Sequence, residues 1–295
     1  NTTGASNVAV GKSSLENNTT GANNVAVGKD ALLANTTASQ NVAIGSLSSV
    51  TTTTGCKNTA VGHASFYNNS TGDNNTALGN FALNDNTTAD NNTAVGYFAL
   101  KANTTGVQNT AVGQGALDSN TTASYNVSIG QASMEDNTTG ASNVAVGTDA
   151  LANNTTASEN TAVGRSALAA NTTGSSNTSV GADSSKTMTT GVNNTALGYA
   201  ALCTLTTGDE NVAVGKSALK NSTTSDNNTA VGNGALAANT TGFDNVAVGH
   251  SALTTNTTSR DNVGLGFCAL HANTTGSRNT ASGSLALDSN TTASD

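Results

Sequence analysis

The chain has 295 residues and a formal net charge of −8; 9% of its residues are charged and 35% are hydrophobic. Ordinary globular domains are about 25% charged and 45–50% apolar, so this chain has too few large apolar side chains for a thick core. Its acidic balance argues against a nucleic-acid partner, and no apolar run approaches the ~20 residues of a membrane span, which argues against membrane insertion.

In chain order, one motif recurs along the sequence: Asn-[Val/Thr]-Ala-[Val/Ile/Leu]-Gly, at a constant step of 17 residues. Its seventeen copies begin at Asn7, Asn24, Asn41, Asn58, Asn75, Asn92, Asn109, Asn126, Asn143, Asn160, Asn177, Asn194, Asn211, Asn228, Asn245, Asn262 and Asn279. If each repeat is numbered from this Asn, then Asn at position 1, Gly at position 5 and Thr at position 14 occur in all 17 copies. Residues with such fixed offsets are expected to stack on their own copies.

The length of the repeat predicts the fold. Two packed helices need about 30 or more residues, whereas 17 residues suit one coil of a β-solenoid. We therefore predict an all-β, single-stack β-solenoid of seventeen coils, with strands ~4.8 Å apart and a rod of roughly 80 Å. Residues 1–295 form one continuous repeat domain in this interpretation, an uncapped segment of a longer array or filament.

Each coil is expected to contain two arms and two turns. Positions 1–4 predict a strand in which positions 2 and 4 share one face and position 3 points the opposite way. The Gly at position 5 predicts a turn with positive φ. The Ala-Leu pair at positions 8 and 9 predicts a second strand or a single helical turn, and Asn-Thr-Thr predicts the second turn, with an Asn ladder along the stack. Each coil would bury three aliphatic side chains, too few to fold alone, so stability should belong to the stack.

Position 3 is Ala in 14 copies and otherwise Ser or Gly. One interpretation is that the strand bends and the Ala packs inside a thin coil. The other is that the Ala column packs against a second chain, as in a homotrimer, with lateral or end-to-end filament packing as the next choice. Ala94, Ala111 and Ala162 represent this self-association column.

The repeated Asn-[Val/Thr]-Ala-[Val/Ile]-Gly motif resembles the repeats of YadA-like head domains in trimeric autotransporter adhesins. The longer unit, N-T-A-V-G-x-x-A-L-x-x-N-T-T-G, is similar to repeat arrays in phage tail fibres and other surface fibres. The resemblance covers the whole chain and implies parallel coils, trimeric packing and an extracellular or virion location. The adhesin heads have shorter coils than this chain. The resemblance implies no catalytic residue.

Residues capable of catalysis are scattered. His63, His250 and His271 occupy variable positions, and Cys56, Cys203 and Cys268 fall in three different columns, many coils apart. The glycines follow the repeat and form no phosphate-binding loop, and the Asp residues follow no calcium-binding pattern. We predict no enzymatic activity, no metal site and no cofactor.

Thr columns at positions 13 and 14 suggest an alternative function, an ice-binding β-solenoid that presents Thr ladders. Ice-binding solenoids use Thr-x-Thr, which places two ranks on one face. Adjacent Thr residues of an extended segment point in opposite directions, so this chain offers one outward rank at best.

The Asn-Thr-Thr segment is also an N-glycosylation sequon. It is equally consistent with a row of glycans and with a simple turn. The candidate acceptors are Asn35, Asn86, Asn103, Asn120, Asn137, Asn171, Asn239, Asn256, Asn273 and Asn290.

Five aromatic residues lie in three adjacent coils and form a candidate contact patch: Phe66, Tyr67, Phe81, Tyr97 and Phe98. Exposed aromatic patches mark interfaces, although local repacking also accounts for such a cluster. Together these features predict a structural or adhesive segment of an extracellular or virion fibre. Its partners would be copies of itself and, in the adhesive case, a host or cell-surface receptor or glycan.

Overall fold

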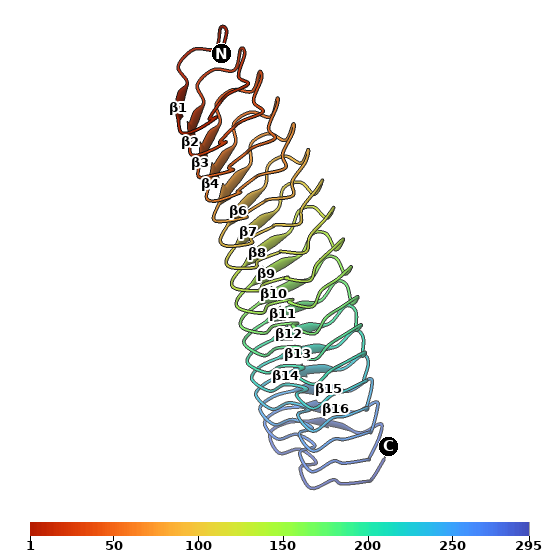
Figure 1. Cartoon of the computed structure of the whole chain (residues 1–295). Coiled ribbons are helices and arrows are strands. Elements are labelled where there is room, and N and C mark those ends of the chain that lie inside the picture. The colour runs from red at the N-terminus through yellow and green to blue at the C-terminus, as the bar shows by residue number, and fades with distance from the viewer. Residues whose placement is uncertain (295) are drawn as a thin grey trace. The chain divides into compact units, whose positions relative to one another are not determined.

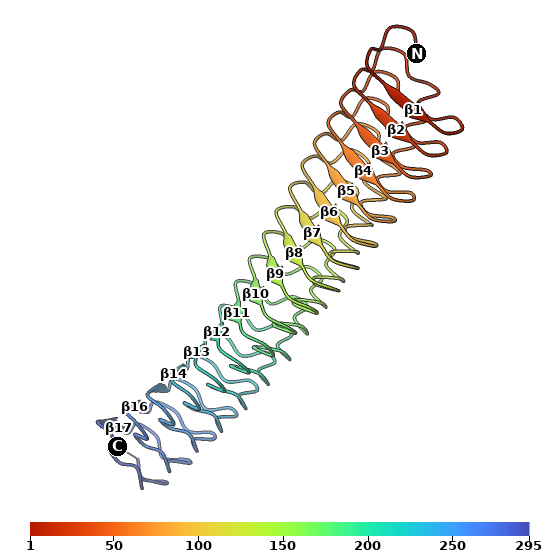
Figure 2. The same cartoon turned by 90° about the vertical axis from the view of Figure 1, so that its left-hand side faces the viewer.

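The computed structural model describes residues 1–294. Two compact units divide the chain, Asn1–Asn143 and Val144–Asp295. Each unit is a β-solenoid of 17-residue coils with one three-residue strand per coil, and neighbouring strands pair in parallel and in register (Figures 1 and 2). The predicted all-β solenoid is therefore confirmed, and the single continuous domain stays a prediction.

The strands occupy positions 2–4 of every repeat. In the first unit they are β1 (Val8–Val10), β2 (Val25–Val27), β3 (Val42–Ile44), β4 (Thr59–Val61), β5 (Thr76–Leu78), β6 (Thr93–Val95), β7 (Thr110–Val112) and β8 (Val127–Ile129). In the second unit they are β9 (Val144–Val146), β10 (Thr161–Val163), β11 (Thr178–Val180), β12 (Thr195–Leu197), β13 (Val212–Val214), β14 (Thr229–Val231), β15 (Val246–Val248), β16 (Val263–Leu265) and β17 (Thr280–Ser282).

The Ala-Leu arm is neither a strand nor a helical turn, because positions 6–11 form consecutive turns and the described residues contain no helix. The Leu at position 9 adopts a left-handed backbone, as Leu100 does at φ +51°. A residue that has a Cβ atom adopts this backbone conformation only at a cost in free energy. Hydrogen bonding between coils offsets the cost: the Leu100 N–H donates to the Ala116 carbonyl of the next coil at 2.9 Å.

The interior of each coil is thin. Small residues at positions 3 and 8 and the large residue at position 9 fill it, and Ala94, Ala99 and Leu100 of one coil are all 0% exposed. Positions 2 and 4 share a face, as predicted, but that face is the outer one. The coil therefore does not bury three large aliphatics: its apolar interior consists mainly of two small residues and one large one.

The position-5 glycine turns the chain out of each strand. Gly113 has φ +138°, and a Cβ built there would lie 2.4 Å from the carbonyl oxygen of Gly130 in the next coil. Gly115 in the same coil has φ +65°, and its Cβ would meet nothing closer than 3.8 Å. The first glycine is therefore required by both backbone conformation and coil spacing, and the second is not.

Replacing Gly113 by Ala is expected to lower the free energy of unfolding by at least about 2 kcal/mol, because it combines a strained φ with a clash against the next coil. Gly115→Ala in the same coil should change it by about 1 kcal/mol or less. Chemical denaturation of the full chain, followed by far-UV circular dichroism, measures both. Equal effects of the two variants would contradict the assignment of a special role to position 5.

Candidate functional site

Two Asn ladders hold each coil closed. At position 1, the Asn24 Oδ1 accepts the backbone N–H of Asn41 at 2.9 Å, and the Asn24 Nδ2 donates to the Ala38 carbonyl at 2.8 Å. At position 12, the Asn103 Nδ2 donates to the Asn86 Oδ1 of the preceding coil at 3.0 Å. Both Asn columns donate to the carbonyl at position 15, so the same three positions close one coil and join it to its neighbours.

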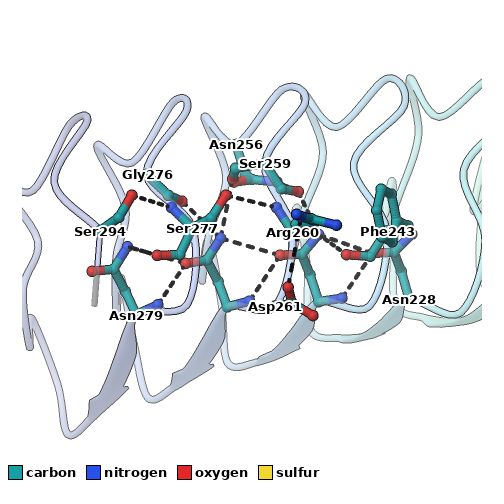
Figure 3. Close-up of polar contacts among 12 residues, drawn as sticks. Asn228, Phe243, Asn256, Ser259, Arg260, Asp261, Gly276, Ser277, Asn279 and Ser294 are labelled. Atoms are coloured by element: carbon teal, nitrogen blue, oxygen red, sulfur yellow. Dashed lines mark hydrogen bonds and ion pairs between the residues drawn. The ribbon is translucent and has the colours of Figure 1, made fainter.

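Figure 3 shows the same arrangement in the second unit. The Asn279 Nδ2 donates to the Asn262 Oδ1 at 3.1 Å. A third column, at position 16, adds bonds from backbone to side chain: the Arg260 N–H donates to the Ser277 Oγ at 3.3 Å, and the Ser277 N–H donates to the Ser294 Oγ at 3.0 Å. The predicted Asn ladder is confirmed and has two columns rather than one.

This geometry overturns the glycosylation hypothesis. The candidate acceptors are the position-12 Asn residues, whose amides face the interior and donate within the ladder. Nine of the ten are 0% exposed: Asn35, Asn86, Asn103, Asn120, Asn137, Asn171, Asn239, Asn256 and Asn273. Asn290 is half-buried and donates in the same way, to Asn273 and Ala293. A glycan on any of these nitrogens would break the ladder, so the sequons are turns.

The hypothesis of an Ala-lined interface is also wrong. Ala94, Ala111 and Ala162 are each 0% exposed because they point into their own coil. The residue at position 3 is small because the two arms of the coil pack closely across it. This is the interpretation in which the Ala packs inside a thin coil. The outward side of the same strand is formed by positions 2 and 4.

That outer side of the strands, positions 2 and 4 of every coil, is called the strand face here. Its 34 residues are Val, Thr, Ile, Leu and one Ser, and none is charged. Several large side chains on it are well exposed, such as Leu78 at 37%, Ile129 at 39% and Leu197 at 46%. In each unit the face is a regular, uncharged stripe two side chains wide, because every strand repeats the same outward pair.

The two Thr columns differ in exposure, as the alternating direction of adjacent residues predicts. The position-13 hydroxyl bonds to the neighbouring coil, as in Thr104, whose Oγ1 donates to the Thr121 carbonyl at 2.9 Å. The position-14 Thr is exposed in every coil, Thr105 and Thr122 included. The prediction of one outward rank is confirmed.

The aromatic residues separate into two environments. Phe66 takes the place of the position-9 Leu and is fully buried, so it is not part of a surface patch, and Tyr67 is half-buried at position 10. The remaining rings, with His63, form what is called the aromatic cluster here: His63, Phe81, Tyr97 and Phe98. The contact patch predicted from the sequence did not include His63, although His63 occupies the same column as Tyr97.

Rings of the aromatic cluster brace one another across three coils. The centroids of Tyr97 and Phe98 lie 3.9 Å apart in a stacked pair, and those of Phe81 and Phe98 lie 5.4 Å apart. His63 meets Phe81 edge-on at 5.3 Å. The Lys101 Nζ lies 4.7 Å from the Phe98 centroid, a cation–π contact.

Ionisable groups in the described residues form no group of three or more that could hold a metal ion. Burial raises the pKa of the Asp118 carboxyl, and Lys101 opposes that rise. Burial likewise raises the pKa of the Cys203 thiol, and the charge of Asp183 adds to the effect. Cys56, Cys203 and Cys268 carry free thiols. A raised thiol pKa lowers the fraction of the reactive thiolate of Cys203.

Comparison with protein-family models and with curated proteins finds no match to this chain. The resemblance to the adhesin heads and tail-fibre arrays therefore stays a prediction. Residues 1–294 include no helix with the length and apolar character of a membrane span.

The position-12 ladder is interrupted where the sequence departs from Asn. Coil 3 carries Thr52 there, and the Oδ1 of Asn35 in the preceding coil is buried without a hydrogen-bond donor. The Asn69 Nδ2 of the following coil reaches the Thr52 Oγ1 only at 3.5 Å. An unsatisfied buried acceptor costs more free energy than a normal bond contributes.

Thr52→Asn should restore the ladder and raise the free energy of unfolding by about 1 kcal/mol, because it supplies a donor to Asn35 and a better acceptor to Asn69. The matched control is Thr54→Asn, an exposed position-14 residue of the same coil. Denaturation midpoints of the full chain compare the two. A Thr52→Asn variant no more stable than the control would contradict the role given to the ladder.

Proposed function

We propose that this chain is a non-enzymatic structural segment of an extracellular or virion fibre, whose copies associate side by side through the strand face. The observation that carries the proposal is the strand face itself, a regular, uncharged stripe of half-exposed Val, Thr, Ile and Leu. The interior of the coils is already filled by other positions, so the exposed part of this apolar surface is available to a partner.

The size of the strand face supports a stable contact. Strands ~4.8 Å apart with three residues of ~3.3 Å each give roughly 400 Å² for each unit. A patch of that size is at the level where exposed apolar surface marks an interaction site. Joining two copies along this face buries about 800 Å² in total for each unit that takes part, and a standard specific interface is about twice that size.

The regularity of the face favours a second copy over an unrelated protein. Its outward side chains recur at the spacing of parallel strands, and a surface of equal spacing lets side chains of both partners interdigitate along the whole contact. Another copy of the chain has the same spacing because it has the same sequence. The resemblance to trimeric adhesin heads also supports association of parallel copies, with a trimer as the expected assembly and the cell surface or virion as its location. A receptor or glycan partner belongs to the same proposal.

Charge placed on the strand face should disrupt the assembly. A variant with Leu78→Lys, Val112→Lys and Ile129→Lys is expected to weaken self-association by at least about 100-fold, because three ammonium groups would be buried without partners. Sedimentation velocity measures the mass of the assembly, and negative-stain electron microscopy of the same samples reports fibres of uniform width.

The matched control places the same charges on the turn of the same coils: Thr88→Lys, Thr122→Lys and Thr139→Lys. These position-14 side chains are exposed and away from the strand, so the control should assemble like the original chain. If both variants lost assembly equally, net charge rather than the strand face would be responsible. A monomeric original chain at micromolar concentration would overturn the proposal.

Ice binding is the second candidate, and one observation favours it. The strand face presents two outward ranks per strand, and position 2 is Thr in nine of the 17 coils. Positions 2 and 4 of a strand lie ~6.6 Å apart and neighbouring strands ~4.8 Å apart, so outward methyl and hydroxyl groups recur at regular spacings. The exposed rank at position 14 adds a second surface.

Position 4 carries Val, Ile or Leu in 16 coils and Ser only at Ser282. Hydroxyl groups are therefore almost confined to one rank, and we expect no thermal hysteresis at micromolar protein. Nanolitre osmometry with inspection of crystal shape measures it. Hysteresis with faceted crystals, abolished by Leu78→Lys, Val112→Lys and Ile129→Lys, would replace the fibre proposal by the ice-binding one.

A further inference from the structure

Charged side chains gather on the outward side of the Ala-Leu arm. The outward side chains of positions 6, 7, 10 and 11 are called the arm face here. These columns lie side by side: the Arg165 Nη2 at position 6 lies 2.8 Å from the Asp183 Oδ2, at position 7 of the next coil, and the Lys186 Nζ at position 10 lies 3.3 Å from the Asp183 Oδ1. The arm face uses different columns from the strand face and, unlike the strand face, it is charged.

In the first unit the arm face carries an acidic cluster, spread over coils 5, 7 and 8. Its members are Asp85, Asp118, Glu135 and Asp136. Burial raises the pKa of the Asp118 carboxyl, Lys101 opposes that rise, and the charges of Glu135 and Asp85 add to it. Carboxylates of different coils are therefore close enough to repel one another on this face.

In the second unit the same columns carry a basic cluster, in coils 10, 11 and 13. Its members, all exposed, are Arg165, Lys186, Lys216 and Lys220. Asp183 is the one carboxylate on the arm face of coils 10–13, and Arg165 and Lys186 share it. Within residues 1–294, Lys216 and Lys220 form no ion pair. The cluster is thus an excess of positive charge on a chain whose net charge is −8.

We propose that these two clusters form a second contact between copies of this chain, in which the acidic cluster of one copy packs against the basic cluster of another copy aligned antiparallel. The partner is a second copy because each chain carries both halves of the contact, and complementary charge favours that pairing over others. The contact uses the arm face, so it does not depend on association through the strand face.

Symmetry selects the antiparallel alignment. If two arm faces meet with parallel stacks in register, each cluster lies against its own counterpart and like charges repel. A parallel contact with a shift along the stack pairs one acidic cluster with one basic cluster and moves the other two apart. A two-fold axis across the stack reverses the order of the coils and keeps each column opposite itself. The first unit of each copy then meets the second unit of the other, and one axis generates both pairings.

The spacing of the charges agrees with this alignment. Asp85 and Asp118 lie two coils apart in the first unit, and Lys186 and Lys220 lie two coils apart in the second, ~9.6 Å along the stack in both cases. An antiparallel alignment that places Asp118 opposite Lys186 therefore places Asp85 opposite Lys220. Asp118 and both Lys residues occupy position 10, and Asp85 is at the adjacent position 11.

The test is made in the full chain carrying Leu78→Lys, Val112→Lys and Ile129→Lys, which removes association through the strand face. Sedimentation velocity at micromolar protein should show a dimer in ~10 mM salt. In ~1 M salt its affinity should fall by at least about 10-fold, because the Debye length drops from ~30 Å to ~3 Å.

Charge reversal in this background tests the pairing itself. One variant carries Lys186→Glu and Lys220→Glu, and the other carries Asp118→Lys and Glu135→Lys. The fold accepts these changes, because position 10 already holds Lys, Asp or Glu in different coils. Each variant alone should dimerise at least about 10-fold more weakly, since both of its clusters have the same sign. An equimolar mixture should recover the dimer, because two acidic clusters then face two basic ones.

The matched control is Lys57→Glu with Arg278→Glu, which changes the net charge as much as the first variant does. Both residues are exposed at position 17, outside the arm face, so the control should dimerise like the background chain. Carbodiimide coupling between isotope-labelled and unlabelled copies reports the alignment, and Asp118 should be joined to Lys186 of the other copy.

A background chain that is monomeric in ~10 mM salt would overturn the arm-face contact. It would leave the strand-face proposal standing, because that proposal is measured in the chain with an unaltered strand face. A dimer insensitive to salt, a mixture that stays monomeric, or a control that loses the dimer equally would also overturn the charge pairing. A salt-sensitive dimer without the coupling of Asp118 to Lys186 between copies would overturn the antiparallel alignment.

Discussion

Hydrogen bonding between each coil and the next, with equivalent residues 17 places apart in register, is the constraint on which each unit depends. Strand pairing, both Asn ladders, the Thr hydroxyls of position 13 and the bonds of position 16 all use this offset. Each coil has little apolar interior of its own, since Ala94, Ala99 and Leu100 represent nearly all of it. Polar groups that satisfy their own copies therefore replace the thick core of an ordinary domain.

This constraint also decides which residues can vary. Positions whose side chains point inward meet an identical neighbour above and below, so a change at one coil disturbs two others. The consequence is visible at Asn171, whose Oδ1 loses its donor because the next coil carries Met188. Outward position 6 meets solvent and accepts Lys, Tyr or His, and the partly buried positions 7 and 10 accept Asp as well. Variation between coils is thus concentrated on the surface, where the aromatic cluster lies.

Much of the fold could be predicted from the sequence, because an unbroken period fixes coil length and stacking without knowledge of any contact. The turn at Gly113 and the Asn ladder follow from residue type and offset. Which side of the strand faces inward does not follow from the sequence. Alternation places Ala111 on the opposite side from Thr110 and Val112, but the small side chain lies inside only because the second arm of the coil packs so closely against the strand. The left-handed Leu100 has no sequence signal, since its conformation is stabilised by the neighbouring coil.

The interruptions of the position-12 ladder bear on how the second unit responds to mechanical load. The bonds between coils run along the stack, so tension in that direction loads successive coils in series and the weakest junction opens first. Met188, Leu205 and Ser222 occupy the ladder position in three consecutive coils, where Met188 and Leu205 replace amide bonds with fully buried apolar contacts. Dispersion contacts are short-ranged and yield after little extension. We therefore expect this stretch to act as the extensible link of the second unit.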